Sequence, residues 1–385
     1  MSEDTHPSST HPPLPPTTED DRASWLRLLR SRRVGPSTFY RLLAEHGSAQ
    51  AALAALPDVA AAAGVTDYSP CPEGVVGAEL KAARAAGAHM ICVGDPAYPP
   101  LLQQISDAPP ILWAIGDPAV LTRTAPMLAL VGARNASSLG LRTARSLATD
   151  LGARGHVIVS GLARGIDTAA HLACLDSGTV AIMAGGVDVL YPAENARLAD
   201  DIARSGIRLS EQPMGLIPQA RHFPRRNRII SGVAQAIIVI EAAAKSGSLI
   251  TARAALDQGR DVLAVPGHPF DARAAGCNML IRDGATLVRN ADDVVEVLPC
   301  ETAGIRTAEP QGTALPEPAP PTPRSLQETA ALHSQILSRL GPSPLAEDQL
   351  IRDLGASAGQ VTPVLTDLEL DGRIRRQPGG LLSRV

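Results

Sequence analysis

Arginine side chains that could bind phosphate gather in one short stretch, Arg221 to Arg228, with the sequence RHFPRRNR. The stretch holds four arginines, one histidine and one phenylalanine, and no Asp or Glu occurs from Gln212 to Ile240. The whole chain has a formal net charge of −4, so this positive charge is local. Cations beside an aromatic ring are the two ingredients of single-stranded nucleic-acid binding. The alternative is a solvated loop that reflects the chain's use of 33 Arg against 2 Lys.

Three glycine-containing turns add cations after predicted strands: VGAR (131–134), SGLARGID (160–167) and KSGSLIT (245–251). Small residues let backbone amides approach an anion, and each turn leads into the positive N-terminal end of a helix. Ligands of open α/β sheets bind beyond the carboxyl ends of the strands. We therefore predict that Arg134, Arg164 and Lys245 line one crevice together with the 221–228 loop. Any one of these turns alone is an ordinary strand-to-helix connection.

Phe223 bears on whether the nucleic acid is single-stranded. Its ring, between Arg221, His222 and Arg225, could stack on an unpaired base or could anchor the loop in the core. Stacking contributes about 1–3 kcal/mol per base, and a duplex hides the ring faces of its bases. The sequence leaves both roles of Phe223 open.

Motifs typical of nucleotide-dependent or hydrolytic enzymes are missing. The sequence contains no GxGxxG, no GxxxxGK[ST] and no GxSxG, so we expect no catalytic residue, no metal and no cofactor. Asp167 and His171 share one face of a predicted helix without an evident nucleophile, and we predict a structural role for both. Glu194, Glu211 and Glu241 are candidate acids or bases only for a small sugar-phosphate substrate. Glu211 is better explained as a partner that steadies the arginine loop, and Glu241 as the end of a strand.

Composition favours a cytoplasmic protein. Five cysteines are scattered without a CxxC pair, which fits a reducing compartment and argues against a zinc site. The N-terminus is polar and proline-rich, unlike a signal peptide, and no apolar run approaches the roughly 20 residues that cross a bilayer. We therefore expect no membrane partner.

Two proline-rich segments divide the chain. Residues 1–20 are expected to form a disordered tail and 301–325 a semi-extended linker, which leaves folded parts at 21–87, 88–300 and 326–385. In 21–87, apolar residues follow helical spacing on both sides of VGPS (34–37). We expect Gly35 to take the left-handed conformation that stops one helix and Pro36 to start the next. This predicts a small SAM-like or helix-hairpin-helix-like domain, with a plain helical packing module as the alternative.

The middle part predicts an α/β fold. Apolar runs of strand length occur at 127–132, 156–160, 179–184, 208–210, 236–241 and 261–266, and helix-length segments separate most of them. Such runs joined by helical crossovers form a parallel sheet that is buried on both faces. We therefore expect an extended, Rossmann-like, doubly wound sheet, with 90–94 and 111–115 as an N-terminal extension.

The last part predicts three helices followed by a hairpin, the outline of a winged helix. Its third helix, at about 357–371, carries Asp367, Glu369 and Asp371 and no basic residue. A helix that reads the major groove needs cations near the phosphates, so sequence-specific duplex recognition is disfavoured. A transcription regulator that uses this domain is the corresponding alternative function.

Eight sequence blocks follow one another in a familiar order: VGARNAS, SGLARGIDTAAH, GGVDVLYPAEN, SEQP, FPRRNRIISG, EAAAKSGSLITARAAL, GRDVLAVPG and GCNMLIRDGA. Over about 90–300 the chain thereby resembles the DNA-processing protein A (DprA/Smf) family. The resemblance implies a cytoplasmic, non-enzymatic protein that binds and protects single-stranded DNA and loads the RecA recombinase onto it during natural transformation. It also implies a homodimer formed through the Rossmann-like domain, involving the segment after Pro266.

The same resemblance implies a set of strand-contacting residues: Arg134, Arg164, Phe223, Arg226, Asn227, Arg228 and Lys245, with Ser246, Gly247 and Ser248 of the last turn. Arg164 stands where family members often have Lys, so the charge is kept. The enzyme alternative is a nucleotide phosphoribohydrolase of the lysine-decarboxylase-like type. Those enzymes carry PGGxGT followed by Glu, whereas SGSLITARAAL here has no acid before Asp257.

Overall fold

The computed structural model describes residues 15–298 without a gap, and residues 332, 335–341, 345–354, 361, 364–365, 368–369, 373–377 and 381–384. They belong to two compact units, residues 1–301 and 302–385, each of which is considered by itself. The linker predicted at 301–325 and most of the predicted tail lie outside the described residues.

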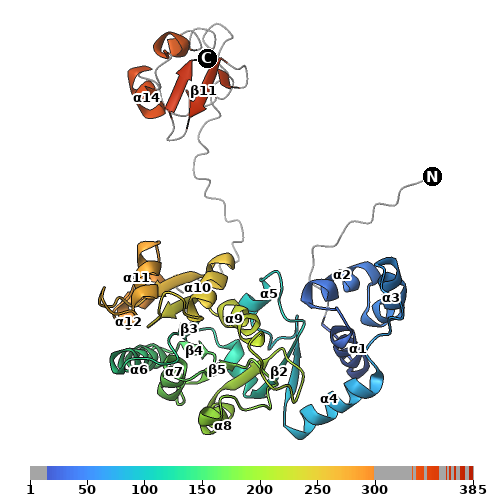
Figure 1. Ribbon diagram of the computed structural model, residues 1–385. Coiled ribbons are helices and arrows are strands. Elements are labelled where there is room, and N and C mark those ends of the chain that lie inside the picture. Colours follow the sequence, from blue (N-terminus) through green and yellow to red (C-terminus); the bar gives the residue numbers. More distant parts are fainter. Residues whose placement is uncertain are drawn as a thin grey trace, which may run out of the picture. The chain divides into compact units, whose positions relative to one another are not determined.

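Nine strands of the first unit form one mixed sheet (Figure 1). They are β1 His89–Cys92, β2 Ile111–Gly116, β3 Met127–Val131, β4 Val157–Ser160, β5 Thr179–Ile182, β6 Ile207–Ser210, β7 Ala236–Val239, β8 Asp261–Ala264 and β9 Thr286–Leu287. Their spatial order is β1-β2-β6-β5-β4-β3-β7-β8-β9. The β1–β2 and β2–β6 pairs are antiparallel, and all the other pairs are parallel. The predicted doubly wound sheet with an N-terminal extension is confirmed. The chain reverses its direction of travel across the sheet between β3 and β7, which makes this the switch point where such folds bind ligands.

Helices cover both faces of the sheet. One face carries α6 Ser138–Ala153, α7 Ile166–Ala173, α8 Ala196–Ser205 and α12 Ala291–Val297. The other carries α5 Pro100–Gln103, α9 His222–Val233, α10 Ser248–Asp257 and α11 Ala275–Arg282. Two 3-10 turns, η1 Pro118–Thr122 and η2 Ala193–Asn195, lie in the connections after β2 and β5. Along β3, Leu128 and Leu130 face the first layer and Ala129 and Val131 the second, because successive side chains of a strand point to opposite faces. The sheet is therefore buried on both sides, as its continuous apolar runs predict.

Four helices precede the sheet: α1 Glu19–Arg30, α2 Pro36–His46, α3 Ala49–Ala62 and α4 Glu73–Ala85. Pro36 begins α2 as expected, but Gly35 is extended at φ −101°. The left-handed residue is Arg33, at φ 65°, so the expectation for Gly35 is wrong. The physical reason is that α1 has already ended at Ser31, whose carbonyl accepts a hydrogen bond from the Val34 amide at 3.1 Å and closes the turn before Gly35 is reached.

The helical part is anchored to the antiparallel edge of the sheet by buried polar contacts. The Arg30 guanidinium binds both carboxylate oxygens of Glu79, at 2.8 and 2.9 Å. Glu79 also accepts a hydrogen bond from the Trp113 indole of β2 at 2.9 Å. The Tyr40 hydroxyl donates to the Ala108 carbonyl at 3.1 Å. These contacts make the helical part and the sheet a single unit.

The second unit contains β10 Leu345–Ala346, α14 Glu347–Leu354, β11 Ile374–Gln377 and β12 Leu381–Arg384. Its sheet has the order β10-β12-β11, so the predicted C-terminal hairpin is present. Most of the predicted third helix at 357–371 lies outside the described residues. None of the described helices in either unit has the length and apolarity that crossing a bilayer requires.

Candidate nucleic-acid interface

A cleft of about 750 Å³ opens beyond the carboxyl ends of the central strands, and we refer to it as the switch-point cleft. Its walls come from the turns that follow β3, β4, β7 and β8 and from the start of α9. Its lining includes Gly132, Arg134, Ala163, Asp167, Phe223, Arg226, Asn227, Lys245, Ser246, Gly247, Ser248, Thr251 and Arg273. Eight of the ten predicted strand-contacting residues therefore meet in one place. Arg164 lines an adjoining small pocket together with Arg134 and Phe223.

Arg134 and Lys245 are the cations that the cleft leaves available. Both side chains are exposed, and among the described residues neither has an ion-pair partner. The Arg134 guanidinium lies over the Phe223 ring, 4.9 Å from its centroid. The Phe223 ring is itself half-buried, so it is neither a core residue nor a free side chain. Arg134 and Phe223 together present a positive charge beside an aromatic ring at the mouth of the cleft.

The arginine-rich stretch predicted as a loop is the first part of helix α9. Pro224 is the third helical residue, where a backbone N–H has no partner within the helix and its loss costs little. The helix then sorts the side chains by its period of 3.6 residues. Phe223 and Asn227, four residues apart, both line the cleft, whereas Arg225 is exposed elsewhere. The sequence pattern does not distinguish the four arginines from one another, but their positions around the helix place them in different surroundings.

Arg226 is not positioned as a free phosphate ligand, which differs from its predicted role. Its residue is only 5% exposed, and its guanidinium donates to the Ile182 carbonyl at 2.9 Å. Burial lowers the pKa of Arg226 to about 10, although Asp167 acts in the opposite direction. A Cβ placed on Gly161 would lie 1.6 Å from this guanidinium, so the side chain packs directly beneath the turn after β4. Arg226 therefore supports the floor of the cleft.

Arg228 lies outside the lining of the cleft and also departs from its predicted role. Its guanidinium forms ion pairs with Glu211 and with Asp107, the latter at 3.2 Å, and donates to the Asp107 carbonyl at 2.7 Å. Its side chain is 15% exposed. Glu211 therefore steadies the arginine-rich segment, as predicted, and burial raises the pKa of its carboxyl group. The ion pair that gives Glu211 a structural role also makes the Arg228 guanidinium unavailable to a phosphate.

Asp167 shapes the turn after β4 from within. Its buried carboxylate accepts hydrogen bonds from the amides of Gly161 and Ala163, at 3.2 and 3.3 Å. Gly165 has φ 81°, and a Cβ there would meet the Ala133 carbonyl oxygen at 2.2 Å, so the turns after β3 and β4 pack tightly on each other. Arg164 projects from this turn with 64% of its side chain exposed and lies 3.6 Å from Glu194. Both side chains are mostly exposed, so this surface ion pair is weak and a phosphate can take the place of Glu194 at Arg164.

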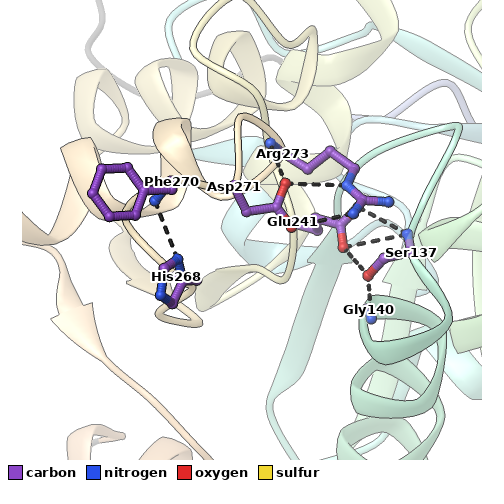
Figure 2. A network of polar contacts seen from close by, with 7 residues as sticks. All are labelled: Ser137, Gly140, Glu241, His268, Phe270, Asp271 and Arg273. Carbon is purple, nitrogen blue, oxygen red and sulfur yellow. Dashed lines mark hydrogen bonds and ion pairs between the residues drawn. The ribbon is translucent and has the colours of Figure 1, made fainter.

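Glu241 occupies the N-terminal end of α6, as Figure 2 shows. Its carboxylate accepts from the Ser137 amide at 3.0 Å and from the Ser137 hydroxyl at 2.5 Å. The Ser137 hydroxyl oxygen in turn accepts from the Gly140 amide at 3.0 Å, which is an N-cap. A carboxylate at this position satisfies the helix dipole, so the end of α6 does not offer the anion site that the turn after β3 predicts. Arg273 lines the cleft. Its hydrogen bond with Asp271 raises the pKa of its guanidinium, and the charge of Glu241 raises it further by a smaller amount.

His171 is structural, and its burial makes stability depend on pH. Its Nδ1 lies 2.8 Å from the Thr179 hydroxyl, which donates to the Ile158 carbonyl, so the imidazole must be the donor. Burial lowers the pKa of His171 from 6.5 to about 3. The folded protein keeps His171 neutral while the unfolded chain takes up a proton below pH 6.5. The stability that the neutral ring contributes is thus complete above pH 6.5 and is lost progressively as the pH falls toward 3.

We expect His171 to account for about 2.5 kcal/mol of lost unfolding free energy between pH 7 and pH 4.5. His171→Asn keeps an amide donor toward Thr179 but does not titrate, so its stability should fall less over this range. Urea unfolding of both proteins at the two pH values measures the difference. Parallel pH profiles would show that the ring is not held neutral.

A larger cavity, of about 1260 Å³, lies between the helical part and α5. Its lining includes Trp25, Tyr40 and Ile105, but it contains no Arg, Lys or His and one acid, Asp21. A polyanion would find no counter-charge there. Size alone therefore does not identify the binding site, and the smaller switch-point cleft fits an anionic ligand better.

Two residues of this edge were missed by sequence reasoning. Arg273 reaches the cleft from the segment after β8, and Tyr191 lies beside Phe223 with 5.9 Å between ring centroids. Arg273 lies 28 residues after Lys245, in the segment after Pro266 that the resemblance associates with dimer formation. Tyr191 belongs to the block GGVDVLYPAEN, whose spacing gives no sign that its ring turns toward α9. Only the packing of the turns after β5 and β8 brings these side chains in.

Comparisons with known proteins match all three folded parts of the chain. The family model for DNA recombination-mediator protein A matches residues 89–299. Models for a DprA-like N-terminal HHH domain and a DprA winged helix domain match residues 19–82 and 320–380. The predicted domain types at both ends of the chain are thereby supported.

Individual relatives are similar over most of their length. The chain is 44% identical over 222 residues to DNA processing protein DprA of Bacillus subtilis, covering 57% of this chain and 74% of that protein. It is 36% identical over 295 residues to Protein Smf of Escherichia coli, covering 76% of each. The solved structure of DNA processing protein A from Streptococcus pneumoniae has a TM-score of 0.55 and 39% identity, covering 60% of this chain and 79% of that one. The structure that concerns the single-stranded DNA binding mode of DNA processing protein A from Helicobacter pylori has a TM-score of 0.50 and 27% identity, covering 54% and 94%.

Proposed function

The chain belongs to the DNA recombination-mediator protein A family, and from this premise we propose that it binds single-stranded DNA in the switch-point cleft without catalysing a reaction. The observation that carries the proposal is the pair Arg134 and Lys245, both exposed and free of ion-pair partners among the described residues, beside the Phe223 ring. Cations that track a backbone and a ring that stacks on a base are the combination that single strands require. The Helicobacter pylori relative, whose single-stranded DNA binding mode is known, supports the same ligand.

The acids near the cleft support binding over catalysis. Asp167 is buried and accepts hydrogen bonds from two amides of the turn after β4. Glu241 is committed to the N-cap of α6. A general acid or base must reach a proton on the substrate. Neither carboxylate is placed to do so while it holds its own turn together.

We extend the proposal to the wider role that the resemblance implies. The bound strand is protected in the cytoplasm and then passed to the RecA recombinase during natural transformation or recombination. We keep the domain boundaries 21–87, 88–300 and 326–385, with the DNA site confined to the middle domain. The acidic third helix predicted in the last domain is compatible with a protein-contacting role for that domain.

Salt dependence tests the central proposal. Two to three cations that neutralise phosphates should give a slope of about −1.4 to −2.1 in a plot of log affinity against log salt for oligothymidine, at about −0.7 per phosphate of a single strand. We expect weaker binding to a blunt duplex of equal length, since Phe223 cannot reach the faces of stacked bases. Fluorescence anisotropy with labelled strands measures both. Salt-independent binding, or equal affinity for the duplex, would contradict the proposal.

We further propose that the protein forms a homodimer through the segment that follows β8. Phe270 lies in this segment with 94% of its surface exposed, and His268 is beside it at 5.6 Å between ring centroids (Figure 2). A phenylalanine that is this exposed lacks the stabilisation of about 1.5–3 kcal/mol that burial of its side chain would contribute. Covering it with a second copy recovers that burial. The cleft residue Arg273 lies three positions away, so a dimer would bring two strand-binding sites toward a shared surface.

Phe270→Glu is expected to shift the protein from dimer to monomer in sedimentation velocity, because it places two like charges in the proposed interface. Ile217→Glu is the matched control, since Ile217 is 72% exposed in a different loop. The control should leave the oligomeric state unchanged. A wild-type protein that is monomeric at high micromolar concentration, or a dimer indifferent to Phe270→Glu, would exclude this interface.

A further inference from the structure

Aromatic residues are scarce in this chain, and their distribution is uneven. The sequence has only 2 Trp, 4 Tyr and 3 Phe. Six of these nine precede β3, in the helical part and the edge of the sheet around β1 and β2. Of the remaining three, Tyr191 and Phe223 are in contact, although 32 residues separate them in sequence. Two rings from different elements therefore converge at the edge where the cations lie.

Tyr191 has no evident structural reason to be aromatic. It is 48% exposed, and no hydrogen bond of its hydroxyl occurs among the described residues. Its ring is tilted by 54° to that of Phe223, with 5.9 Å between centroids. Arg134 lies over Phe223, 4.9 Å from the centroid. The three side chains form a connected group, from the cation of the cleft through Phe223 to an exposed ring.

The pocket beside this group is too small to enclose a base. Arg134, Arg164, Tyr191 and Phe223 line a space of about 40 Å³, with the glycine turn after β4 as its floor. A space of this size admits at most a few water molecules. A base must therefore lie on the outside of the Tyr191 ring, where stacking needs only an accessible face.

The order of strands sets the direction in which the group extends. Lys245, Arg134, Arg164 and Tyr191 follow β7, β3, β4 and β5, which are neighbours in that same order in the sheet. Adjacent strands lie about 4.8 Å apart, so the ends of these four strands span about 14 Å along the carboxyl edge. The sequence of side chains along this edge is cation, cation, cation and ring.

We propose that Tyr191 is a second base-stacking position, which receives an unpaired base of the strand whose phosphates Lys245, Arg134 and Arg164 neutralise. The proposal rests on the proposed function and deepens it. The bound strand runs across the edge of the sheet from β7 toward β5, and Tyr191 ends the contact with an aromatic face. The ligand is any unpaired base, because stacking requires a π face and no particular hydrogen-bond pattern.

The test compares Tyr191→Ala with Tyr191→Phe on oligothymidine and on a strand of equal length whose central nucleotides are abasic. Tyr191→Ala is expected to weaken binding to oligothymidine about 10-fold, whereas Tyr191→Phe stays within about 2-fold of the wild type. The slope against salt should not change in either variant, because a lost stacking contact releases no counterions. On the abasic strand, Tyr191→Ala and the wild type should bind equally.

The outcomes separate the inference from the proposed function. If Tyr191→Ala binds oligothymidine like the wild type, or loses as much affinity for the abasic strand, Tyr191 does not stack on a base and the inference is overturned. If the wild type itself shows no salt-dependent binding to oligothymidine, the proposed function has failed. Thermal unfolding of Tyr191→Ala establishes that the variant is folded, and Tyr191→Phe shows whether a ring alone suffices.

Discussion

Replacing Arg134 and Lys245 together by alanine is expected to lower the affinity for oligothymidine by about 100-fold or more at 0.1 M salt. Each residue is an exposed cation of the switch-point cleft without an ion-pair partner among the described residues. A hydrogen bond to a charged group contributes about 1.5–3 kcal/mol, so two such losses amount to at least two orders of magnitude. The slope of log affinity against log salt should also become shallower by about 1.4, at 0.7 per phosphate no longer neutralised.

The control for this pair removes the same charge from another place. Arg221 and Arg225 are exposed at the start of α9 and do not line the cleft. Arg221→Ala/Arg225→Ala changes the net charge equally and should cost less affinity and less of the salt slope. Anisotropy titrations at several salt concentrations measure both double variants. Equal losses in the two would mean that the general charge of α9, and not the geometry of the cleft, attracts the strand.

Arg228→Ala is expected to destabilise the first unit by about 3–5 kcal/mol, because it leaves the buried Glu211 carboxylate without its cation. Thermal unfolding should show a decrease in Tm of roughly 10 °C for a unit of this size. The folded variant should bind oligothymidine with the wild-type salt slope, since Arg228 does not line the cleft. These two readouts distinguish a structural arginine from a strand-contacting one.

A second substitution locates the cause of this destabilisation. Glu211→Gln added to Arg228→Ala removes the unpaired buried charge and should restore part of the lost stability. If Arg228→Ala instead unfolds like the wild type and loses affinity and salt slope, Arg228 contacts the strand and its ion pairs with Glu211 and Asp107 break on binding. Urea unfolding of the single and double variants, followed by titration, decides between these results.

Much of the fold follows from local sequence. Continuous apolar runs such as 127–132 and 236–241 have the length of strands buried on both faces, and helix-length segments between them favour parallel pairing. Each strand must then end at the same edge as its parallel neighbours. For this reason the sequence predicts that the cations that follow β3, β4 and β7 lie at one edge. The eight ordered sequence blocks identify the family for the same part of the chain.

The arginine-rich segment shows where local sequence stops being sufficient. RHFPRRNR was expected to be a loop, yet it begins a helix, and Pro224 is tolerated there because a proline in the first turn costs no hydrogen bond. Once the segment is helical, the environment of each arginine depends on its angle around the axis. Arg226 is then buried under Gly161, and Arg228 pairs with Glu211. Gly161 and Glu211 belong to other elements, so the eight residues alone do not show which arginine is buried, which is paired and which is exposed.

The doubly wound sheet and the edge at which a polyanion would bind follow from periodicity and from the direction of parallel strands, and the family follows from the eight ordered blocks, so all three can be inferred from the sequence. Which cations remain free, in contrast, depends on how the chain packs. That choice depends on which carboxylates approach each guanidinium, and the partners of Arg228, Asp107 and Glu211, come from two different segments. The same packing brings Tyr191 against Phe223. Side chains that are distant in sequence determine the charge and shape of the cleft, and only folding brings these side chains into contact.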